Sequence, residues 1–106
     1  MAKYLLEVSY GTEGAKGILK DGGSKRRQVV EVGIKAAGGK LEAFYFAFGK
    51  KDAYVIIDVP DHISVAGMVL VVNASGAASV TTTVLLTPEE IDQASKKSFS
   101  YIPPGR

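Results

Sequence analysis

The stretch GGKLEAFYFAFGKKDAYVIIDVPD, residues 38–61, decides the fold of this chain. It holds two runs rich in aromatic and branched residues, residues 40–48 and 52–59, separated by the turn Gly49-Lys50-Lys51. So few residues between two long strands predict an antiparallel hairpin. Pro60 has no backbone N–H to donate and therefore ends the second strand.

Upstream of the hairpin, the sequence first predicts a strand and a short helix. Residues 4–10 alternate like a strand and end at Gly11. The segment TEGAKGILK, residues 12–20, predicts a helix with Thr12 as its N-cap. The following DGGS, residues 21–24, interrupts this helix, because a glycine costs about 1 kcal/mol in a helix interior.

A second helix is predicted between that break and the hairpin. Ser24 is expected to cap it, and Gly38-Gly39 end it, in keeping with the preference for glycine after a helix. Its small and branched side chains repeat with the spacing of a stripe that packs on a sheet. The stripe consists of Val29, Val30, Gly33, Ile34 and Ala37.

A third helix and a last strand are predicted after Pro60. Asp61 and Ser64 are expected to serve as N-cap and first-turn partner of the helix, which ends near residues 73–76. The segment SVTTTVLL, residues 79–86, is rich in β-branched residues and predicts a strand.

The C-terminal region predicts one more helix and an extended arm. In TPEE, Thr87 precedes Pro88 and stands three residues before Glu90, which is a capping box with proline at the first helical position. The tail YIPPGR, residues 101–106, is not helical.

The predicted order is β-α-β-β-α-β plus a final helix. With right-handed crossovers this order gives a ferredoxin-like α+β fold, a four-stranded antiparallel sheet with helices on one face. At 106 residues the chain is expected to form a single domain, residues 1–106.

Strand alternation predicts different roles for the two faces of this sheet. Phe44, Phe46 and Phe48 are expected in the core under the helices, with Leu41, Ala43, Tyr45 and Ala47 on the opposite face. That opposite face mixes apolar and hydrogen-bonding residues: Leu5, Ile56, Leu85, Glu7, Tyr45, Tyr54, Asp58, Thr81 and Thr83. Such a mixture is typical of a surface that is covered but still partly hydrated. An example is the interface of a homodimer or higher homo-oligomer that encloses a cleft.

Several segments resemble the GYD-domain proteins, small bacterial proteins of the dimeric α/β-barrel group. The resemblance covers residues 3–104 and rests on DGGSKRR, the hairpin, and NASGAASVTTTVLLTPEEIDQASKK. The naming motif Gly-x-Tyr-Asp stands here as Gly49-Lys50-Lys51-Asp52, with Lys51 in the tyrosine position. The resemblance implies an oligomer built on sheet faces and implies no reaction.

Two functional hypotheses remain open for the mixed face. In the first, the protein is a non-catalytic binding or structural protein, with a small-molecule ligand near Tyr45, Tyr54, Thr81 and Thr83. In the second, it is a cofactor-independent enzyme, resembling a monooxygenase or isomerase. There Glu7 or Asp58 acts as general base and a tyrosine hydroxyl stabilises the oxyanion.

The segment DGGSKRR, residues 21–27, is a further candidate for ligand binding. Glycines before a helix expose backbone N–H groups, and Arg26 and its basic neighbours add positive charge. Such an arrangement can bind a phosphate or carboxylate. A solvated basic turn is the simpler interpretation.

Composition narrows the function classes. The chain has no cysteine, which excludes thiol chemistry, and a net charge of only +2, which argues against nucleic acid as a partner. No apolar run is long enough to cross a membrane, so a cytoplasmic protein is expected. The single histidine, His62, is expected on the surface at the start of a helix, and we expect neither a metal nor a cofactor.

Overall fold

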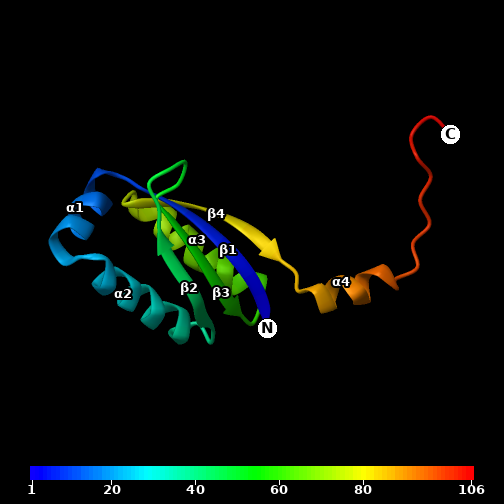
Figure 1. Cartoon of the computed structure of the whole chain (residues 1–106), viewed down its shortest axis with the longest axis horizontal. Helices are drawn as coiled ribbons and strands as arrows, with labels where there is room; N and C mark the ends of the chain where they lie inside the picture. The colour runs from blue at the N-terminus through cyan, green and yellow to red at the C-terminus, as the bar shows by residue number, and fades with distance from the viewer.

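The computed structural model describes all 106 residues and contains one four-stranded antiparallel sheet with the strand order β2-β3-β1-β4 (Figure 1). The strands are β1 (Ala2–Tyr10), β2 (Lys40–Phe46), β3 (Ala53–Val59) and β4 (Ala78–Leu85). The helices are α1 (Thr12–Asp21), α2 (Gly23–Ala36), α3 (His62–Ser75) and α4 (Pro88–Ser95). The predicted α+β fold with ferredoxin-like order is confirmed.

The core lies between the sheet and the helices. In the central strands β1 and β3 every second residue is buried, as the alternation in the sequence predicts. Ile34 of α2 and Val65 of α3 complete this layer from the helix side. The buried residues are Tyr4, Leu6, Val8, Ile34, Ala53, Val55, Ile57, Val59, Val65 and Ala78.

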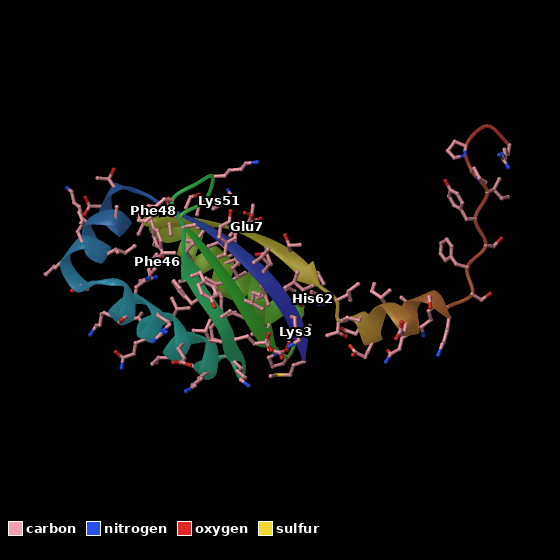
Figure 2. The ribbon with its side chains drawn as sticks, in the orientation of Figure 1. Lys3, Glu7, Phe46, Phe48, Lys51 and His62 are labelled. Carbon is pink, nitrogen blue, oxygen red and sulfur yellow. The ribbon has the colours of Figure 1, made fainter.

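Phe46 and Phe48 are not core residues, so the prediction is wrong for both: Phe46 lies on the helix side but is 41% exposed. Strand β2 ends at Phe46, and the Phe48 side chain is fully exposed at the end of the sheet where β2 leads into β3 (Figure 2). The chain turns there because the Ala47 N–H donates to the Asp52 carbonyl oxygen at 2.8 Å. This turn removes Phe48 from the alternation that places Phe44 and Phe46 on the helix side.

Leu41 also lies on the opposite side of the sheet from the one predicted. The register shifts between Leu41, which pairs with Ile57, and Ala43, which pairs with Ile56. The extra residue, Glu42, forms a bulge that reverses the alternation before it. Leu41 therefore packs against the core on the helix side.

The two glycine-flanked helices start differently from the prediction, whereas the later caps are confirmed. The N-caps of α1 and α2 are Gly11 and Gly22, and neither Thr12 nor Ser24 caps a helix. Gly22 has φ 84°, a conformation that glycine adopts at little cost, so the chain turns directly into α2. In contrast, Asp61 accepts a hydrogen bond from Ser64 N, and Thr87 forms the predicted capping box.

The C-terminal segment lies away from the body of the molecule (Figure 1). No residue of α4 is buried, and the tail that follows exposes Phe99, Tyr101 and Ile102. The radius of gyration is 16.9 Å, compared with about 13 Å for a compact chain of about 100 residues. We call residues 88–106 the C-terminal arm. The predicted terminal helix and extended tail are confirmed.

Candidate functional site

The face of the sheet turned away from the helices, the open face, brings four of the predicted site residues into one row. Tyr45 pairs with Tyr54, Tyr54 with Glu7, and Glu7 with Thr81. Directly opposed residues have Cβ atoms about 5 Å apart, so these side chains are neighbours across all four strands. We call them the polar row.

A second row runs beside the polar row and is mostly apolar. It consists of Ala43, Ile56, Leu5 and Thr83, which pair in that order across the sheet. We call it the apolar row. Because Leu5 and Ile56 are only half-buried, the centre of the open face presents apolar surface beside the hydroxyl and carboxyl groups of the polar row.

Asp58 lies apart from the polar row, in an ion-paired cluster. Lys3 Nζ donates to Asp58 Oδ2 at 3.0 Å and also to Glu42. These hydrogen bonds, the one to Glu42 first, raise the pKa of the Lys3 ammonium group. Figure 2 shows Lys3 near one end of β1 and Glu7 nearer the other. The two candidate bases therefore belong to different sites, and Asp58 is held by a lysine.

The side chain of Arg26 is on the other side of the sheet, far from the tyrosine and threonine candidates. It lines a groove of about 430 Å³ between α2, α3 and the helix side of the sheet. Leu6, Val8 and Val55 form the floor of this groove. The predicted ligand-binding residues are thus divided between two surfaces.

The groove exists because the two helices stand apart. Helix α2 packs mainly on β2, whereas α3 packs mainly on β4, so the central strands are left partly uncovered between them. The volume of the groove falls in the range of about 300–1,000 Å³ that is typical of small-molecule sites. Neither this groove nor the smaller principal cavity includes Glu7, Tyr45 or Tyr54.

Two helix glycines widen the groove. Gly33 of α2 and Gly67 of α3 both line it, and a Cβ atom added at either position would meet no atom within 4 Å. Gly33 therefore does not pack on the sheet as its place in the predicted stripe suggested. Each glycine costs about 1 kcal/mol relative to alanine in a helix, and no contact within the chain offsets this cost. The interior glycines of these two helices can be read from the sequence and could have pointed to the groove.

Arg26 and Tyr10 line the groove at its end next to α1, where it meets a second cavity of about 250 Å³. The Arg26 Nε atom is buried without a hydrogen-bond acceptor, and Arg26 takes part in no ion pair. Burial raises the pKa of the Tyr10 phenol, and the nearby Arg26 guanidinium opposes this rise. Sequence reasoning named Arg26 but missed Tyr10, because their proximity depends on where the first turn of α2 lies relative to the end of β1.

The basic segment before α2 is only partly a cationic site. Lys25 and Arg26 line the smaller cavity, but so do the carboxyl-bearing residues Glu13 and Asp21. Arg27 is exposed and lines neither cavity. Carboxylates therefore offset the positive charge predicted for this helix start, although Arg26 itself forms no ion pair.

His62 is exposed as the first residue of α3, as predicted. It lies at the end of the sheet opposite Phe48 (Figure 2). The chain contains no group of three or more histidine, aspartate or glutamate side chains placed to hold a metal ion. No helix is both long and apolar enough to cross a bilayer.

The motif Gly49-Lys50-Lys51-Asp52 has a clear structural role. Asp52 Oδ2 accepts a hydrogen bond from Tyr10 N at 2.8 Å, and Asp52 N donates to Val8 O at 2.9 Å. The aspartate thus ties the β2–β3 connection to the end of β1. Lys51 is half-buried in the same connection (Figure 2).

Comparison with known proteins gives one result. The family model described as GYD domain matches residues 4–95 of the 106-residue chain. Searches of curated proteins and of solved structures found no match. The matched region runs from β1 to the end of α4 and includes the hairpin, the anchoring Asp52 and both walls of the groove. The chain belongs to the GYD-domain family.

Proposed function

We propose that the protein is a homo-oligomer that binds a small molecule, with the open face joining subunits and the helix-side groove holding the ligand. The observation that carries the binding function is the groove itself. It has a volume of about 430 Å³, a nearly uniform apolar lining and a single charged residue. A concave apolar site with a few polar groups is the usual form of a ligand site.

Self-association is supported by the surfaces that the single chain leaves uncovered. No helix covers the open face, where Leu5 and Ile56 stand at the centre of the apolar row. The four strands, spaced about 4.8 Å apart, give the open face a flat area of roughly 440 Å². A stable interface buries about 800 Å² on each partner. The C-terminal arm, with its exposed aromatic residues, supplies further surface for a second copy.

The association is tested by placing a charge in the apolar row. Ile56→Lys is expected to convert the assembly into a monomer of 11.2 kDa, because a buried unpaired ammonium group opposes association. The measurement is size-exclusion chromatography with light scattering. Leu19→Lys is the matched control, since Leu19 is 87% exposed on α1, away from the open face.

The control variant should keep the wild-type mass. An Ile56→Lys protein that is folded by circular dichroism and still elutes with the wild-type mass would show that the open face does not join the subunits. The enzyme hypothesis for the polar row is less well supported, because neither principal cavity reaches Glu7.

A further inference from the structure

We infer that the ligand of the groove is a hydrophobic carboxylate, with its acid group on Arg26 and its apolar body along the groove between α2 and α3. The inference rests on the proposed binding function and names its ligand class. It does not depend on self-association.

Arg26 is a cation that the chain itself leaves unpaired. No carboxylate lies within ion-pair distance of its guanidinium, and its Nε atom is buried without an acceptor. A buried donor without a partner is destabilising, so such groups are normally satisfied in the functional state. The planar guanidinium offers parallel N–H donors that match the two oxygens of a carboxylate. Tyr10 lines the groove beside it and carries a hydroxyl group.

The remainder of the groove suits an apolar body. Apart from Arg26 its lining carries no charge, and Phe44, Met68 and Val72 are among its walls. Gly33 and Gly67 leave open space on both helices, where larger side chains would close the gap. The groove is therefore shaped for a linear or aromatic hydrocarbon group rather than for a sugar or a nucleoside, which need several polar partners.

The charges around Arg26 disfavour a second negative charge on the ligand. Beyond Arg26, the smaller cavity adds Lys25 but also Glu13 and Asp21. These two carboxylates already balance the charges of Lys25 and Arg26, so they repel a second negative charge on the ligand. A phosphate monoester, with nearly two charges at neutral pH, is thus a poorer match than a carboxylate.

The test compares two probes of equal chain length, octanoate and 1-octanol, by isothermal titration calorimetry at pH 7. Wild-type protein is expected to bind octanoate at least about tenfold more tightly than octanol, as for a charge-assisted hydrogen bond. Arg26→Gln should abolish that preference by weakening octanoate binding to about the level of octanol binding. Arg27→Gln, which removes the same charge from an exposed neighbour outside both cavities, should keep the preference.

A second pair of variants locates the site. Gly67→Leu places a side chain in the groove and should weaken both probes, whereas Ala66→Leu adds the same side chain at an exposed position on α3 and should weaken neither. If wild-type protein binds the two probes with equal affinity and Gly67→Leu binds neither, the carboxylate inference is wrong and the binding function stands. Binding of neither probe would overturn both.

Discussion

Gly33 and Gly67 stand in the interiors of α2 and α3 without a neighbour within 4 Å of an added Cβ. We predict that Gly33→Ala and Gly67→Ala each raise the free energy of unfolding by about 0.5–1 kcal/mol, because alanine restricts the unfolded chain and fits the helix. Urea unfolding of each variant measures the effect.

Gly39 provides the contrast. A Cβ atom there would lie 2.5 Å from Val59 Cγ1 and 2.7 Å from the Asp58 carbonyl oxygen, so Gly39→Ala should lower the free energy of unfolding. If Gly33→Ala or Gly67→Ala were as destabilising as Gly39→Ala, the groove would not be open at that position.

Asp61 gives a prediction of pH dependence. Its carboxylate caps α3 by accepting a hydrogen bond from Ser64 N at 2.8 Å, and this bond lowers its pKa from the ordinary value of 3.8. A lowered pKa in the folded state means that the stabilisation is fully present above the unfolded-state pKa and is lost as the pH falls through the folded-state pKa. Asp61→Ala should therefore reduce stability at pH 7 and have progressively less effect as the pH falls below 3.8.

Urea unfolding of Asp61→Ala and of the wild type, at pH 7 and at a pH below 3.8, checks this cap. Asp21→Ala removes a carboxylate from the last turn of α1 and should not reduce stability, since Asp21 forms no ion pair and caps no helix start. A loss in Asp61→Ala that is equal at both pH values would contradict the role of the charged cap.

Local signals in the sequence predicted some of these residues and missed others. Asp61 and Thr87 were found because a cap depends on residues only three positions away. Ser24 was misassigned because Gly22 caps α2 two residues earlier. A Cβ atom added at Gly23 would lie 2.8 Å from the Phe46 ring. That contact joins two distant segments, and no local pattern reports it.

The β2–β3 connection depends on Asp52 as its anchor to β1. We predict that Asp52→Ala lowers the free energy of unfolding by about 1–3 kcal/mol, because the partly buried Tyr10 N–H loses its acceptor. Asp52→Asn retains an acceptor oxygen and should cost less. Thermal or urea unfolding of both variants measures the difference.

Equal losses in Asp52→Ala and Asp52→Asn would show that the carboxylate charge, rather than the hydrogen bond to Tyr10, holds the connection. Lys51→Ala is a suitable neighbour control, since Lys51 makes no side-chain hydrogen bond or ion pair.

Helices and strands were predicted correctly where their side chains repeat with a regular period. The predicted sheet face of a side chain was wrong where one extra residue shifts that period. The hairpin, its proline stop and all four helices follow from alternation, helical spacing and glycine breaks. The bulge at Glu42 moved Leu41 to the other face, and the early end of β2 exposed Phe48. Both differences depend on how β2 pairs with β3, and the alternation within β2 alone does not specify that pairing.

For the whole molecule, the sequence predicted the topology and the mixed open face but not the groove. Helical stripes show which sides of α2 and α3 turn toward the sheet, but they do not give the distance between the helices. Here α2 lies over β2 and α3 over β4, so residues predicted as core, such as Val29, are left half-exposed at the groove. The separation of Arg26 from Tyr45 and Tyr54 follows from the same arrangement.

Native mass spectrometry of freshly purified protein, followed by denaturation of the same sample, tests most directly whether the open face is covered by a second copy. We predict a native mass that is a multiple of 11.2 kDa, with any retained ligand appearing as added mass that is lost on denaturation. A native mass of 11.2 kDa at micromolar concentration would contradict self-association, and the open face would then be an ordinary amphipathic surface of a monomer.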